Sequence, residues 1–181
     1  MHFEEGHVYH IINRSNEKIF YCNENYLFFI RKIRRHLEPI CEIIAWCLMP
    51  NHFHLIIMAN AQSTNFTGES HRPGTQLFSK NLGIVLSSYT RAINNSNRRR
   101  GKLFGHKTKA LQITHRNENY LLNCIHYIHH NPLDSGIVNK LEDWEYSSYL
   151  DYSGKRNGTL INRDLIRDIF NIESLSELAV D

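Results

Sequence analysis

The residues best suited to chemistry in this sequence are His52 and His54, which one residue separates within an apolar run. On a β-strand, alternate side chains point to the same face, so the two imidazoles would stand about 6.6 Å apart along the backbone. Imidazoles at this separation can bind one divalent metal ion. They can equally be two half-buried histidines that hydrogen-bond to neighbouring carbonyl groups, so the spacing alone leaves both interpretations open.

A second polar group lies on the segment 118–131, whose apolar residues recur at helical spacing. Tyr127 and Asn131 are one helical turn apart, so they project from the same side of that helix. The amide oxygen of Asn131 is our candidate for the third metal ligand, and Tyr127 would then project into the same space. His130 is the residue that could replace Asn131 in this role. An oxygen ligand and exchangeable positions favour Mg²⁺ or Mn²⁺ over structural zinc.

A site of this kind suits phosphoryl transfer. A tyrosine hydroxyl has a pKa of about 10, so at neutral pH it is a poor nucleophile unless its acceptor is made more electrophilic. A divalent ion on a phosphate oxygen has that effect, because it neutralises charge that develops at phosphorus. Tyr127 could then attack in line, which would give a 5′-phosphotyrosine link and a free 3′-hydroxyl. In the alternative reaction the same ion activates water, and the protein is a metal-dependent nuclease.

Basic residues gather between the second long helix and the last strand, in and after the segment 97–102. Aromatic residues are close to them in sequence, and this mixture suits a single-stranded backbone and its bases. A charge run can also be a solvated loop, and a formal net charge of +3 permits a nucleic-acid partner without requiring one. The residues that we expect to contact DNA are Arg14, Arg98, Arg99, Arg100, Lys102, Lys107 and Lys109.

The composition fits one folded globular domain, because 41% hydrophobic and 11% aromatic residues are too many for a disordered chain of 181 residues. The longest apolar run is far too short to span a bilayer. The beginning of the chain lacks a secretory pattern, and the cysteines form no C-x-x-C pair. We therefore expect a cytoplasmic protein without membrane contact. The sequence leaves open whether it is a monomer or a homodimer.

The elements that position these residues follow from the hydrophobic periodicity. It predicts a strand over 8–13, a helix over 23–38, a hairpin of two strands over 43–58, a loop over 59–75, a helix over 77–95, strand pieces at 103–104 and 110–114, and a helix over 118–131 that ends before Pro132. This order predicts an α+β fold: a ferredoxin-like split β-α-β antiparallel sheet with helices mainly on one face and an extra helix that bears Tyr127.

Two further expectations follow from this arrangement. The hairpin strands would be central, so that His52 and His54 stand on the sheet beneath a helix. Residues 1–152 would form the catalytic domain, and residues 153–181 a weakly helical tail that packs on it.

Residues 47–55 contain Cys-Leu-Met-Pro-Asn-His-Phe-His-Leu, and residues 127–133 contain Tyr-Ile-His-His-Asn-Pro-Leu. These two segments resemble the signature blocks of the single-tyrosine HUH transposases. Together and in this order the blocks are a highly specific signal. The resemblance extends over roughly residues 6–152 and is closest to the REP-associated tyrosine transposases.

The resemblance implies a metal-dependent endonuclease and strand transferase of DNA transposition and recombination, which acts on single-stranded DNA and often on small hairpins. It assigns the paired histidines and Asn131 to the ion and Tyr127 to nucleophilic attack. The choice of Tyr127 over Tyr120 or Tyr89 rests on this resemblance rather than on periodicity.

The sequence departs from the family pattern at two places. Ser15 stands where a glycine is usual, and residues 105–108 replace a Gln-x-Arg-aromatic run, which leaves the DNA sequence preference open. A third interpretation is a DNA-hairpin-binding protein that descends from such an enzyme and has lost catalysis. The presence of both histidines, Tyr127 and Asn131 argues against it.

Overall fold

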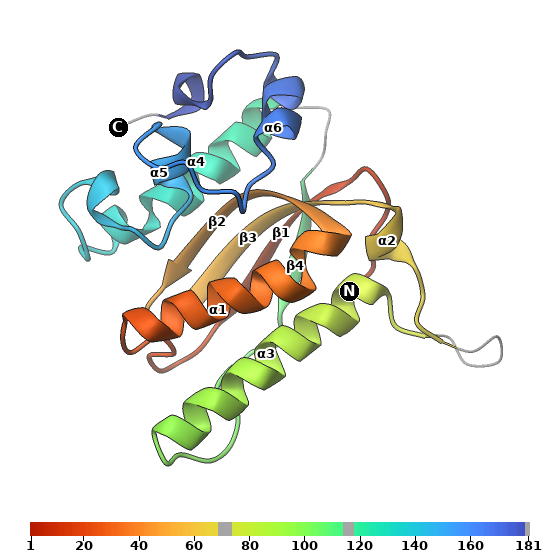
Figure 1. Ribbon diagram of the computed structural model, residues 1–181, viewed down its shortest axis with the longest axis vertical. Coiled ribbons are helices and arrows are strands. Elements are labelled where there is room, and N and C mark those ends of the chain that lie inside the picture. Colours follow the sequence, from red (N-terminus) through yellow and green to blue (C-terminus); the bar gives the residue numbers. More distant parts are fainter. Residues whose placement is uncertain (69–73, 114–117, 180–181) are drawn as a thin grey trace.

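The computed structural model describes residues 1–68, 74–113 and 118–179 (Figure 1). Its centre is a four-stranded antiparallel sheet in the order β2-β3-β1-β4. The strands are β1 (Val8–Arg14), β2 (Cys41–Met49), β3 (His52–Ala59) and β4 (Lys109–Ile113). One helix connects β1 to β2 and another precedes β4, so this is the predicted ferredoxin-like split β-α-β sheet.

One face of the sheet carries the helices that connect the strands. These are α1 (Asn23–His36) and α3 (Leu77–Ser96), with the short η1 (Glu38–Ile40) and α2 (Ala61–Thr64) at their ends. Phe29 of α1 packs against Phe53 of β3 with ring centroids 5.2 Å apart and against Tyr89 of α3 at 5.0 Å. All three rings are fully buried, so this layer is the main hydrophobic core.

The opposite face carries the helix that bears Tyr127. This is α4 (Glu118–Asp134), and η2 (Leu141–Asp143), α5 (Tyr149–Tyr152), α6 (Arg163–Phe170) and η3 (Leu175–Leu178) follow it along the chain. Neighbouring residues of a strand point to opposite faces, and Phe53 meets α1 whereas His54 meets Tyr127 of α4. The fold class is therefore as predicted, with α4 and the C-terminal segments forming a third layer (Figure 1).

The prediction that both hairpin strands are central was wrong for β2, which lies at the edge of the sheet. A segment far along the chain covers this edge. The amide of Leu48 donates a hydrogen bond to the carbonyl of Tyr146 at 2.8 Å, and the amide of Ser148 donates to that of Trp46 at 2.9 Å. Because these bonds satisfy the outer backbone groups, an apolar strand can occupy an edge and stay buried.

Pro132 does not end α4, contrary to the prediction, and the helix continues to Asp134. The termination lies at Gly136, whose φ of +66° is left-handed. There the amide of Gly136 donates to the carbonyl of Leu133 at 2.9 Å, and the amide of Ile137 donates to that of Pro132 at 2.9 Å. These are the closing bonds of a Schellman motif. A proline in the last turn removes only one helical hydrogen bond, so the glycine decides where the helix stops.

Two smaller predictions also differ from the structure, and a third cannot be compared with it. Residues 103–104 are not in a strand, although Leu103 is buried. The predicted loop over 59–75 contains α2 and a β-bridge between Phe66 and Gln76, while its residues 69–73 lie outside the described ranges. The predicted end of the last strand, residue 114, also lies outside them.

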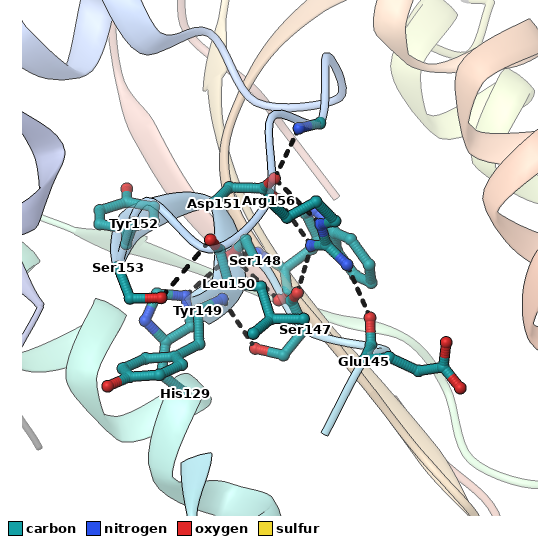
Figure 2. A network of polar contacts seen from close by, with 12 residues as sticks. His129, Glu145, Ser147, Ser148, Tyr149, Leu150, Asp151, Tyr152, Ser153 and Arg156 are labelled. Atoms are coloured by element: carbon teal, nitrogen blue, oxygen red, sulfur yellow. Dashed lines mark hydrogen bonds and ion pairs between the residues drawn. The ribbon is translucent and has the colours of Figure 1, made fainter. Parts of the chain in front are cut away.

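The C-terminal segment is tied to the sheet by the buried carboxylate of Asp151 (Figure 2). Arg156 forms an ion pair with Asp151 at 2.6 Å, and the amide of Gly158 donates to the same carboxylate at 2.8 Å. The guanidinium of Arg156 also lies 5.3 Å from the ring centroid of Trp46 in β2. The residues after this point that join the same hydrophobic core are Leu160, Ile161, Ile166, Leu175 and Leu178.

Candidate active site

Strand β3 places His52 and His54 next to each other on the face that α4 covers. Their ring centroids are 4.9 Å apart, and the residues are 8% and 0% exposed. Burial lowers the pKa of His52 to about 4, and the nearby charge of Arg14 adds to this effect. Burial, together with the neighbouring histidines, also lowers the pKa of His54 well below 6.5. Both imidazoles are therefore neutral at pH 7, the form that can bind a metal ion.

Hydrogen bonds at Nδ1 orient both rings. The Oδ1 atom of Asn51 lies 2.7 Å from Nδ1 of His52, and because an amide oxygen only accepts, this nitrogen carries the hydrogen. Nδ1 of His54 lies 2.8 Å from Nε2 of His10 in β1. Nε2 of His54 is buried and has no hydrogen-bond partner among the described residues. A buried nitrogen without a partner costs about 1–3 kcal/mol, so this atom fits a metal ligand.

Helix α4 brings Tyr127 and Asn131 over the histidine pair. The ring of Tyr127 meets that of His54 edge-on with centroids 5.8 Å apart, although the residue is 54% exposed. The Asn131 side chain lies near His52 and acts to raise the pKa of that imidazole, against the larger effect of burial. The Nδ2 group of Asn131 donates to the carbonyl of Tyr127 at 2.7 Å, so its Oδ1 is the atom available for an ion. The structure thus brings the four predicted residues together, and their donor atoms suit a divalent cation.

Two of the proteins to which this chain is similar are named as REP-associated tyrosine transposases. No family model matches the chain. A protein of Haemophilus influenzae named for the REP-associated tyrosine transposases is 26% identical over 127 residues, which are 67% of this chain and 69% of that protein. A solved structure of a REP-associated tyrosine transposase bound to a REP hairpin aligns with a TM-score of 0.63. The resemblance to the REP-associated tyrosine transposases is confirmed. That structural alignment covers 90% of this chain and 92% of the other chain at 16% sequence identity. It therefore shows that the two proteins share a fold.

The other histidines of α4 point away from this site. His129 is buried, lies 2.8 Å from the hydroxyl of Ser148, and belongs to the network in Figure 2. Nδ1 of His130 donates to the carbonyl of His126 at 2.9 Å, and Nε2 of His126 donates to the carbonyl of Leu178 at 2.9 Å. His130 therefore bonds to its own helix, on the flank next to the tail, and Asn131 is the better placed third ligand.

Most of the predicted DNA-binding residues line a cleft of about 750 Å³ between α3 and the loop that precedes β4. They are Arg99, Arg100, Lys102 and Lys107. The prediction missed the α3 side of this cleft, formed by Ser87, Thr90, Arg91, Asn94 and Asn95. These polar residues recur at steps of three and four on one side of the helix, and they run toward the basic cluster. That periodicity is a signal from which the sequence could have indicated them.

The remaining predicted basic residues lie apart from this cleft. Arg14 is opposite His52 in the β1–β3 register, and Lys109 is opposite Ile12 in the β1–β4 register, so both are on the histidine face of the sheet. Arg14 and His52 also line a smaller cleft of about 460 Å³. Arg98 is exposed in a left-handed turn with φ of +50°. Six of the seven residues therefore form two groups, and Arg98 belongs to neither.

Among the described residues, no helix is both long enough and apolar enough to cross a membrane.

Proposed function

We propose that this protein is a metal-dependent DNA nicking and strand-transfer enzyme of the transposase type, which acts on single-stranded or hairpin DNA through Tyr127. The observation that carries the proposal is the half-exposed Tyr127 ring beside a pair of buried neutral imidazoles, one of which has an unpartnered nitrogen. The relatives named as transposases, one of them bound to a REP hairpin, support hairpin DNA as the substrate.

The residues that would hold a Mg²⁺ or Mn²⁺ ion are His52 and His54, through Nε2, and Asn131, through Oδ1. When bound there, such an ion would neutralise negative charge that develops on the scissile phosphate. The donor atoms come from rigid elements, since the two imidazoles stand on one strand and the amide is held by its own helix backbone.

Tyr127 would act as the nucleophile because its ring lies against the histidine pair while the side chain stays open to a substrate. Its phenolic oxygen forms a bond to phosphorus and loses its proton, while the bond from phosphorus to the 3′-oxygen breaks and that oxygen gains a proton. The protein is then joined to the 5′ phosphate of the DNA, and a 3′-hydroxyl is free. One phosphodiester replaces another, so an incoming 3′-hydroxyl can reverse the step.

The two groups of basic residues give DNA a path to this site. Asn13 lines the cleft on the α3 face, and its neighbour Arg14 is on the histidine face. Both stand at the end of β1, where β3 and β4 begin with His52 and Lys109. A strand bound in the cleft can therefore pass around this end of the sheet and reach the histidines, with its phosphates near cations along the way.

The experiment that tests the proposal is incubation with labelled hairpin DNA and Mn²⁺ or Mg²⁺, followed by a denaturing gel. We expect a band in which DNA stays attached to the protein. Tyr127→Phe should abolish this band and leave DNA binding nearly unchanged. Tyr120→Phe is the matched control, because Tyr120 is also on α4 and is 52% exposed, and it should retain the band.

Other outcomes contradict the proposal in distinct ways. An adduct that persists in Tyr127→Phe means that another group attacks. Cleavage without an adduct in the unmodified protein means that water is the nucleophile. Binding without cleavage or adduct under all metal conditions means that the protein only binds DNA.

A further inference from the structure

His10 is a buried imidazole at the candidate site that neither signature block includes. It lies on β1 and is 8% exposed. Its ring is nearly parallel to that of His54, with centroids 5.0 Å apart and planes at 27°, and the two nitrogens that face each other are 2.8 Å apart. The ring of Tyr127 is also close, with centroids 6.5 Å apart. His10 therefore touches both a candidate metal ligand and the candidate nucleophile.

The hydrogen bond between His10 and His54 can run in either of two directions. If His10 donates, Nδ1 of His54 must accept, and the hydrogen of the neutral His54 ring is then on Nε2. That would place a buried donor where no acceptor lies among the described residues, and it would remove the lone pair that an ion needs. If His54 donates from Nδ1, its Nε2 keeps a lone pair that faces the site.

His52, the other candidate metal ligand, has a hydrogen bond at Nδ1 whose direction is certain. Asn51 accepts a hydrogen bond from Nδ1 of His52 at 2.7 Å, and this leaves Nε2 of His52 unprotonated. A group that engages the second nitrogen of a ligating histidine fixes both the tautomer and the ring orientation. His10 occupies the corresponding position toward His54.

His10 is less well placed to be a metal ligand itself. Its Nε2 already faces Nδ1 of His54, which is on the side of that ring away from the free Nε2. Moreover, across residues 1–68, 74–113 and 118–179, no three or more His, Cys, Asp or Glu side chains come together in a way that could hold an ion. The imidazoles of His10, His52 and His54 therefore do not converge on one point.

We propose that His10 is a positioning residue that accepts the Nδ1 hydrogen of His54 and so fixes His54 in the tautomer whose Nε2 can bind the divalent ion. The part of this proposal that concerns metal binding by His54 rests on the metal site of the proposed function. The tautomer itself is a property of the metal-free protein, so it can be tested separately.

The first test is nuclear magnetic resonance of the metal-free, ¹⁵N-histidine-labelled protein at neutral pH. Long-range proton–nitrogen correlations distinguish a hydrogen on Nδ1 from one on Nε2, and the His54 signals are assigned by their loss in His54→Gln. We expect hydrogen on Nδ1 for His54 and an unprotonated Nε2 for His10. A hydrogen on Nε2 of His54 overturns the proposal, whether or not the protein binds a metal.

The second test compares variants by Mn²⁺ titration, with free ion measured by electron paramagnetic resonance. His10→Gln keeps an acceptor oxygen and should bind Mn²⁺ within about threefold of the unmodified protein. His10→Leu has a similar volume but no acceptor, and should bind about 10- to 100-fold more weakly. Asn51→Ala should weaken binding to a similar degree through His52.

A purely space-filling role for His10 predicts that Leu is tolerated as well as Gln, and that result overturns the proposal. Electron spin echo measurements of the bound Mn²⁺ should detect two histidine nitrogens in both the unmodified protein and His10→Leu. Three in the unmodified protein would show that His10 is a ligand. If the unmodified protein binds no Mn²⁺, the proposed function loses its metal, and the tautomer measurement still decides the role of His10.

Discussion

At the scale of residues, burial decides the chemical state of the site. The helix above the sheet removes water from His10, His52 and His54, and burial lowers the pKa of all three. The rings therefore present lone pairs rather than positive charge at neutral pH. A pair of exposed histidines with the same spacing would be partly protonated at slightly acidic pH and would compete poorly for a metal ion.

The role of Asn131 as a metal ligand can be tested by removing its amide or by replacing the amide with a carboxylate. Asn131→Ala should weaken Mn²⁺ binding about 10-fold, whereas Asn131→Asp retains an oxygen, adds negative charge and should bind at least as tightly as the unmodified protein. Asn123→Ala, at an exposed position of the same helix, is the control and should have no effect. Equal affinities in the Ala variant and the unmodified protein would remove Asn131 from the site.

The buried His129 predicts a specific loss of stability in acid. Burial lowers its pKa from 6.5 to about 3, so between these values the unfolded chain binds a proton that the folded protein does not. The free energy of unfolding should therefore fall as pH falls through this window, by up to about 1.4 kcal/mol per pH unit for this one group. His129→Gln should make that pH dependence shallower by about this amount in urea denaturation series.

The comparison for His129 is one of slopes, because the substitution can also change stability at neutral pH. His2→Gln changes an exposed histidine and should keep the slope of the unmodified protein. A slope in His129→Gln that matches the unmodified protein would mean that His129 does not stay neutral when folded.

At the scale of elements, the end of α4 matters because this helix carries both Tyr127 and Asn131. A proline in its last turn suggests a weak end, yet the helix is closed by the hydrogen bonds of the left-handed Gly136. The last carbonyl groups are thereby satisfied, and the turn that carries Asn131 is held in helical geometry.

Two glycine substitutions distinguish the role of Gly136 in closing α4 from the general effect of replacing glycine by alanine. Gly136→Ala should lower the free energy of unfolding by about 1 kcal/mol, because a side chain disfavours its φ of +66°. Gly83→Ala, within α3 where an added Cβ meets nothing within 4 Å, should raise it by about 0.5–1 kcal/mol. Chemical denaturation measures both, and a neutral Gly136→Ala would contradict the proposed closure.

At the scale of the whole molecule, the sheet separates two surfaces that one DNA molecule would have to reach together in the proposed reaction. The basic cleft is on the face that α3 covers, and the histidine site is on the face that α4 covers. They meet at the end of β1, where Asn13 and Arg14 point to opposite sides. Under the proposed function, substitutions should therefore be able to impair DNA binding and catalysis independently.

The cleft should contribute most of the salt dependence of DNA binding. Arg100→Gln with Lys107→Gln removes two cations from it, and this should reduce the slope of log affinity against log salt by about 1.5. Arg31→Gln with Arg35→Gln removes the same charge from the exposed side of α1 and should leave the slope nearly unchanged. Fluorescence anisotropy with a hairpin at several salt concentrations measures both, and equal slopes in the two double variants would place the DNA elsewhere.

Periodicity predicts how candidate site residues of one element are placed relative to each other, whereas the choice of Tyr127 over Tyr120 or Tyr89 came from the family resemblance. The two-residue repeat of a strand puts His52 and His54 on one face, and the turn of a helix puts Tyr127 above Asn131. These relations depend only on backbone geometry that every strand and helix shares. The chain order of strands and helices predicted the fold class for a similar reason, because short right-handed connections leave few topologies.

Only the tertiary structure showed which elements face one another. The pairing of His10 with His54 depends on the register between β1 and β3, and the edge position of β2 depends on residues about 100 positions later that cover it. The α3 side of the cleft likewise takes part only because the loop before β4 folds against it. Such contacts join residues far apart in the chain, and they form because together they bury and pack the whole core. A local pattern in the sequence carries no information about that packing.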